Sequence, residues 1–119
     1  MTKFAGFTGS PRPIIAIHIL ALIGVLFWLS TIIQAFIAGS ENAIAILLIG
    51  ITLGGAHIAI SRFTTLHNRK AIGAMWFVLV SDSLLTIFAD RMAIVLVLFT
   101  VVLLLLTLTP SAKAWFQKS

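Results

Sequence analysis

The sequence contains no cysteine, and this absence excludes several kinds of site. Without thiols the chain can form no disulfide, use no cysteine nucleophile and hold no cysteine-ligated zinc or iron–sulfur cluster. Acids are scarce too, because Glu41, Asp82 and Asp90 are the only three in 119 residues. Three scattered acids do not make the paired carboxylates of a glycosidase or a multi-carboxylate metal site. Since GxSxG and GxxxxGK motifs are also absent, the sequence predicts a protein that is not an enzyme.

Charge is scarce and apolar residues are abundant. Only 9% of the residues are charged and 61% are hydrophobic, whereas about 25% of an ordinary soluble domain is charged. The mean hydropathy of +1.18 agrees with this, and a chain of this length could not cover its surface with so few polar residues. The composition therefore excludes a water-soluble fold and favours a surface in contact with hydrocarbon.

Four long apolar runs predict four membrane spans, each close to or above the roughly 20 residues that a crossing helix needs. Pro13 suits the first turn of a helix, and Arg62 to Lys70 divides the chain into two hairpins. An extension of the second span to Thr65 is left open. We expect one integral membrane domain over residues 1–119, an all-α four-helix transmembrane bundle with spans at about 13–38, 43–61, 71–89 and 92–109.

The loop charges predict the orientation of these spans. Cytoplasmic loops carry an excess of Lys and Arg, and in the four-span arrangement only Arg91 falls on the side that also holds Glu41 and Asp90. Both termini and the central loop are therefore expected in the cytoplasm. The basic residues there face anionic lipid headgroups rather than nucleic acid; they are Lys3, Arg12, Arg62, Arg69, Lys70, Lys113 and Lys118.

Small residues recur at helical spacing and predict where the helices pack. Ala21 and Gly24 lie on one face of the first span, and Gly50 and Gly54 form a small-xxx-small pair in the second. Helices in lipid associate through such residues because their backbones can approach closely. Tight packing is the simpler interpretation of this pattern, and a water-filled pore is the alternative.

Asp82 is the one acid inside a predicted span. Placing an ionised carboxylate there costs about 2.5 to 3.5 kcal/mol on insertion scales, so the side chain should face other helices. At comparable depth Trp28, Thr31, Thr52 and Thr100 could complete an intramembrane polar layer. Asp82 is then either a hydrogen-bonded structural acid or a proton or cation site, and both interpretations stay open.

His18 and His57 are expected at similar depth, near the cytoplasmic ends of antiparallel first and second spans. Two facing histidines could hold haem b, but no spacing motif supports a haem, and histidines near a membrane surface commonly bond to the backbone. We therefore expect no cofactor and no metal, and keep haem b as the alternative. His67, in the central loop, is interpreted as a solvated residue.

The tail alternates cations with Trp115 and Phe116, a composition typical of an anchor at the membrane interface. Its segment TPSAKAWF, residues 109–116, resembles the endings of uncharacterised small four-span membrane proteins of actinobacteria. The resemblance covers eight residues of 119 and carries no catalytic motif. It implies a multi-pass protein of a bacterial plasma membrane.

Three functional hypotheses follow. The first is a non-catalytic accessory or assembly subunit of a larger membrane complex, respiratory or envelope-related, because such a chain offers partners little except its helix faces. The second is a small homo-oligomeric transporter or channel built around Asp82. The third is a membrane immunity or resistance protein. Other integral membrane subunits are the partners that the first hypothesis requires.

Overall fold

The computed structural model describes residues 10–117, and the regular secondary structure of this part of the chain is all helical, without strands. The expected all-α class is thus confirmed. Three long helices come first, followed by a short 3-10 turn and two further helices. Their bounds are Arg12–Ile37 for α2, Ala43–Thr65 for α3, Lys70–Phe88 for α4, Arg91–Ala93 for η1, Ile94–Thr107 for α5 and Pro110–Phe116 for α6.

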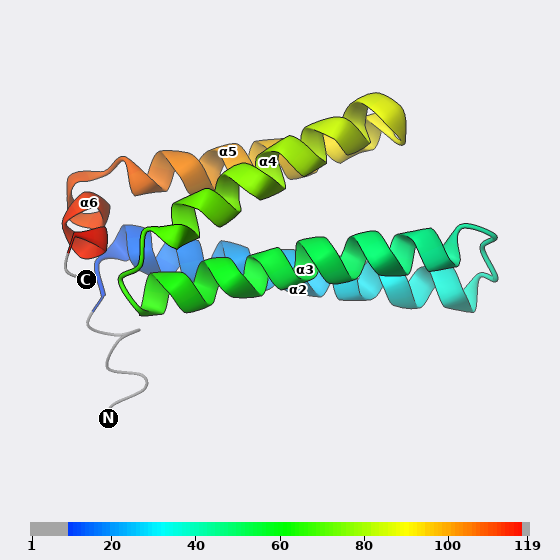
Figure 1. Cartoon of the computed structure of the whole chain (residues 1–119), viewed down its shortest axis with the longest axis horizontal. Coiled ribbons are helices and arrows are strands. Elements are labelled where there is room, and N and C mark those ends of the chain that lie inside the picture. The colour runs from blue at the N-terminus through cyan, green and yellow to red at the C-terminus, as the bar shows by residue number, and fades with distance from the viewer. Residues whose placement is uncertain (1–9, 118–119) are drawn as a thin grey trace.

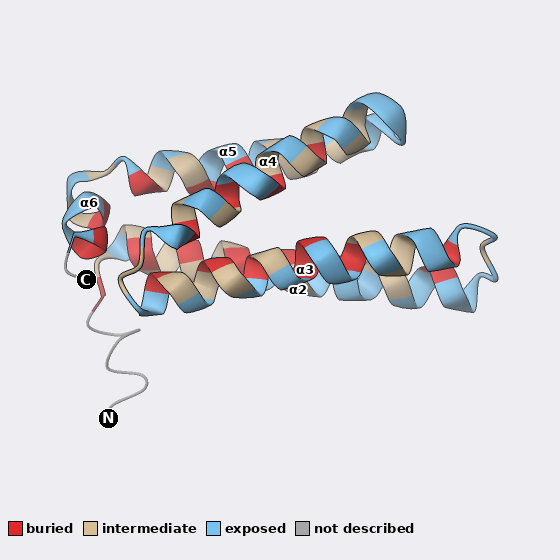
Figure 2. Cartoon of the chain, viewed as in Figure 1, coloured by how far each residue is buried: buried red, intermediate tan, exposed pale blue. Residues whose placement is uncertain are grey.

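The helices form two antiparallel hairpins, α2–α3 and α4–α5, which lie together at one end and diverge toward the other (Figure 1). The short α6 lies across the end where the hairpins meet, beside the connection between α3 and α4. Buried residues follow the faces that the hairpins turn toward one another (Figure 2). The principal extents are 46 × 30 × 18 Å.

Local sequence explains where the first hairpin turns. Gly39 follows α2 with φ +65°, a conformation that costs glycine little. Its N–H donates to the carbonyl of Phe36, and the N–H of Ser40 donates to the carbonyl of Ala35. This pair of bonds is a Schellman motif, which satisfies the last carbonyls of a helix and ends it.

The same motif ends α3, but with a histidine where glycine is usual. His67 has φ 57°, and its N–H donates to the carbonyl of Thr64 while the N–H of Asn68 donates to the carbonyl of Phe63. A residue with a Cβ adopts this conformation at a cost of roughly 1–2 kcal/mol. Contacts of the His67 side chain, described below, offset that cost.

Glycines allow α2 and α3 to approach closely. Gly24 on α2 and Gly50 on α3 are buried, and a Cβ at Gly50 would lie 2.6 Å from Cδ1 of Ile32. Ala21 and Gly54 are buried as well. All four residues predicted to pack thus lie in the interior of the fold.

Large apolar side chains cover the outside of the helices, with Phe88 and Ile37 each 81% exposed. The helices α2, α3 and α4 are each long and apolar enough to cross a membrane. The fourth predicted span differs from the expectation of one helix over 92–109. The η1–α5 segment and α6 meet at 80°, and η1 and α5, with 3 and 14 residues, lie at the short end of the roughly 17–25 residues that cross a bilayer.

Candidate functional site

Asp82 is almost fully enclosed between the hairpins, with 2% of its surface exposed. Its Oδ2 accepts a hydrogen bond from Oγ1 of Thr100 on α5, at 3.1 Å. Its Oδ1 is buried and has no hydrogen-bond partner among residues 10–117. Leaving a buried acceptor unpaired costs about 1–3 kcal/mol. The Asp82 carboxylate therefore lacks a hydrogen-bond donor that its burial calls for.

His57 lies opposite a glycine on the neighbouring helix. Its Nδ1 is 2.8 Å from the carbonyl oxygen of Leu53, one turn earlier on α3. Because a carbonyl only accepts, Nδ1 carries the hydrogen, and Nε2 is the acceptor of the neutral ring. The ring lies so close to Gly24 that a Cβ there would be 2.2 Å from Cδ2 and 2.5 Å from Nε2. The absence of a side chain at Gly24 therefore makes room for the imidazole of His57.

His57 and Asp82 line the same small cavity, of about 70 Å³, where the two hairpins meet. The sequence placed the two residues in separate groups. Residues from α2, α3, α4 and α5 line this cavity, and most of them are apolar. Besides His57 and Asp82 they are Ile23, Gly24, Phe27, Trp28, Val95, Leu96 and Phe99.

The predicted polar layer is only partly assembled around Asp82. Thr100 bonds to the carboxylate, and Trp28 lines the cavity beside it. The hydroxyls of Thr31 and Thr52 instead donate to carbonyls of their own helices, at 2.8 and 2.9 Å. A threonine in a helix readily forms such a bond to the carbonyl four residues earlier, so shared depth did not bring these two side chains to the acid.

His18 and His57 occupy different turns of the α2–α3 interface. Nδ1 of His18 is 2.8 Å from Oγ of Ser61, whereas His57 lies against Gly24, six residues further along α2. At about 1.5 Å per residue this separation amounts to about 9 Å along the helix. Bis-histidine ligation would need both Nε2 atoms at one iron, and the haem b alternative for these two residues stays a prediction. Within residues 10–117 no three His, Asp or Glu side chains are grouped to hold a metal ion.

His67 and Trp115 join the central loop to α6. The indole Nε1 of Trp115 donates to the carbonyl of Thr64 at 2.7 Å, and His67 Nδ1 donates to the carbonyl of Trp115 at 3.0 Å. The two rings lie with centroids 3.9 Å apart, and Phe116 is 2% exposed. His67 is therefore a half-buried contact residue rather than a solvated one, and the two aromatic residues of the tail pack inside the protein.

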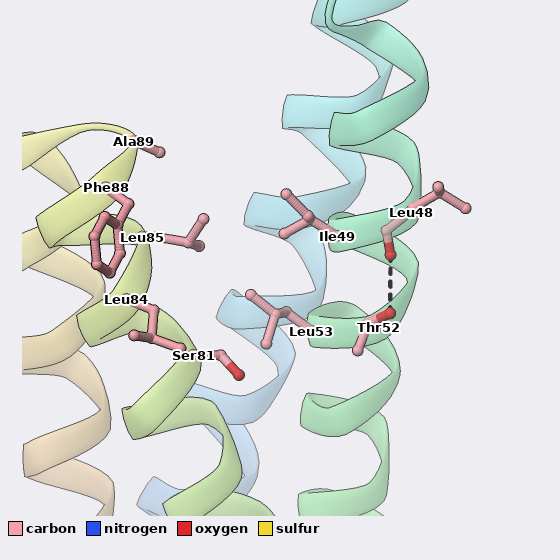
Figure 3. Close-up of a pocket in the computed structure, with 9 residues that line it drawn as sticks. All are labelled: Leu48, Ile49, Thr52, Leu53, Ser81, Leu84, Leu85, Phe88 and Ala89. Atoms are coloured by element: carbon pink, nitrogen blue, oxygen red, sulfur yellow. Dashed lines mark hydrogen bonds between the residues drawn. The ribbon is translucent and has the colours of Figure 1, made fainter.

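Two larger hollows lie between helices. One, of about 450 Å³, separates α3 from α4 where the hairpins diverge. Figure 3 shows Ile49 and Leu53 of α3 pointing toward Leu85 of α4 across it. The other, of about 640 Å³, runs along α4, α5 and α6 and has Arg69 and Lys113 among its lining residues.

Comparison with known proteins identifies no relative of the chain. No known protein family, curated protein or solved structure matches the chain.

Proposed function

We propose that the chain is a four-span protein of a bacterial plasma membrane and acts as a non-catalytic accessory or assembly subunit of a larger membrane complex. In this proposal α2, α3 and α4 each cross the bilayer, and η1–α5 crosses a fourth time with α6 turned along the surface. Both termini and the α3–α4 connection lie in the cytoplasm.

The observation that carries the proposal is the cleft between α3 and α4. It is about 450 Å³ in volume and its polar lining side chains are Thr52 and Ser81. Thr52 is satisfied by its own helix, so the cleft offers apolar walls and few polar groups that need a partner. Helices in lipid associate by van der Waals packing, and a cleft of this kind accommodates large apolar side chains of a partner's transmembrane helix.

The distribution of charge supports the orientation. Seven of the eight basic residues lie on one side of the four-span arrangement, although Lys3 and Lys118 are outside the described residues. Arg69 and Lys113 line the groove along α4, α5 and α6 on that same side. Cations beside an apolar groove suit an acidic phospholipid, whose headgroup is attracted by about 1 kcal/mol per basic residue near the surface.

A second candidate function is a small homo-oligomeric transporter or channel that uses Asp82. The unpaired Oδ1 and the cavity shared with His57 favour it, because ionisable groups inside a membrane commonly mark transport pathways. The third hypothesis, an immunity or resistance protein, is favoured by no contact in residues 10–117.

Extraction in mild detergent tests the first proposal against the second. The wild-type chain should come out in a stoichiometric complex with a different membrane protein. Leu85→Trp, which places a larger side chain in the cleft, should release that partner. Ile87→Trp is the matched control, since Ile87 lies on the same helix, is 71% exposed and does not line the cleft. A lone monomer, or a complex unaffected by Leu85→Trp, contradicts the subunit proposal, and a homo-oligomer with ion flux favours the transporter.

A further inference from the structure

When Asp82 is ionised, the cavity at the junction of the hairpins contains more hydrogen-bond acceptors than donors. Asp82 contributes Oδ1, which has no partner among residues 10–117. His57 contributes Nε2, which is an acceptor in the neutral ring because Nδ1 donates to the carbonyl of Leu53. Both side chains line the cavity.

The surrounding side chains cannot supply two donors. The hydroxyl of Thr100 is within hydrogen-bond distance of Oδ2 of Asp82 and of the carbonyl oxygen of Leu96. The indole N–H of Trp28 is the one donor group among the remaining lining side chains, which are otherwise apolar. One N–H satisfies at most one of the two acceptors well, so another donor is needed.

The size of the cavity fits water. A cavity needs about 10–15 Å³ to hold one molecule, and a buried water requires two to four polar partners. This cavity offers about 70 Å³, and its polar partners are the carboxylate, the imidazole and the indole. A single water has two O–H donors, so it can donate to Oδ1, which is buried without a partner among residues 10–117, and to Nε2 as a second acceptor.

We propose that the cavity holds ordered water that donates to Oδ1 of Asp82 and Nε2 of His57, and that the two side chains thereby form one proton-binding site. A proton taken up by either group then changes the hydrogen bonds of the other through the shared water. The site does not depend on whether the chain is a subunit or a transporter.

Other charged groups lie away from this site. On the four long helices the remaining ionisable side chains are Arg12 and His18 on α2, Arg62 on α3 and Lys70 on α4, and α5 has none. None of them lines the cavity. Asp82 and His57 are therefore the two ionisable side chains among the residues that line the cavity.

Nuclear magnetic resonance of the labelled protein in lipid bilayers tests the proposal in two ways. Magnetisation should pass from water to the ring nitrogens of His57 in the wild-type chain. Asp82→Asn should lower the proton affinity of His57 by about tenfold, because the negative charge beside the imidazolium is lost, and His57→Asn should change the proton affinity of Asp82 as well.

His18→Asn is the matched control, since His18 belongs to the same helix pair and bonds to Ser61 instead. It should leave the proton affinity of Asp82 within about twofold. No transfer from water to His57 would overturn the hydrated site, and this measurement needs no variant to fold. An unchanged proton affinity of His57 in Asp82→Asn, or an effect of His18→Asn on Asp82 as large as that of His57→Asn, would overturn the shared proton-binding site.

Discussion

Gly24→Ala tests the closest helix contact in the structure. The added Cβ would lie 2.2, 2.5 and 2.7 Å from Cδ2, Nε2 and Cγ of the His57 imidazole. All three ring atoms would be too close to the added Cβ. The whole imidazole must therefore move, because rotating the end of a flexible side chain would not relieve the contact. Moving the ring also breaks its bond to the carbonyl of Leu53, which is 2.8 Å long.

The magnitude follows from these two effects. Overpacking a tight interior costs about 1–3 kcal/mol, and an intramolecular hydrogen bond contributes about 0.5–1.5 kcal/mol. Alanine gains about 1 kcal/mol over glycine in helix propensity, so we expect Gly24→Ala to lower the free energy of unfolding by about 1–3 kcal/mol in all. Reversible unfolding in mixed micelles, followed by circular dichroism, measures this change.

Two further variants make the test specific. A Cβ at Gly55 meets nothing within 4 Å, so Gly55→Ala should keep or raise stability by up to about 1 kcal/mol through helix propensity. Adding His57→Ala to Gly24→Ala should recover part of the loss, since the two residues are in contact. If Gly24→Ala is as stable as Gly55→Ala, the reasoning about this contact is refuted.

Three more results are expected. Thr100→Val should lower the free energy of unfolding by about 1–3 kcal/mol, because Oδ2 of Asp82 loses its donor; no loss in thermal denaturation contradicts that bond. Trp115→Ala should release α6 and make the tail sensitive to protease, since the indole bond and ring stacking that dock it are lost; an equally resistant tail speaks against this docking. The native chain has no cysteine, so a single introduced cysteine can be labelled specifically. Cysteine at Asn68 should react with an impermeant reagent only from the cytoplasm, and cysteine at Asn42 only from outside. Labelling at Asn68 from outside would contradict the proposed topology.

Helix positions were largely predictable from the sequence because local signals determine them. Pro13 lies in the first turn of α2, Gly39 provides the left-handed residue after it, and the apolar runs extend nearly to the observed ends. The prediction was incomplete after Thr107, where the chain bends by 80° into α6. Polar residues and Pro110 indicate where the fourth span ends, but these local signals do not give the angle at which α6 packs against the other helices.

The candidate site was less predictable than the helices. Depth grouped four residues with Asp82, and of these the structure brings Thr100 into contact with the carboxylate. His57 was grouped with His18 because both were counted from the cytoplasmic ends of their helices. Which residues of the second hairpin face His57 depends on the rotation and tilt of α4, and these arise from packing across the whole interface.

Photo-crosslinking in native membranes tests most directly whether the α3–α4 cleft receives a partner helix. A photo-reactive amino acid at Leu85 should crosslink the chain to one other membrane protein, whereas the same probe at Ile87, 71% exposed on the same helix, should yield little of that product. Leu85 crosslinks only to lipid or to a second copy of this chain, or equal yields of the partner from both positions, would contradict the accessory-subunit proposal.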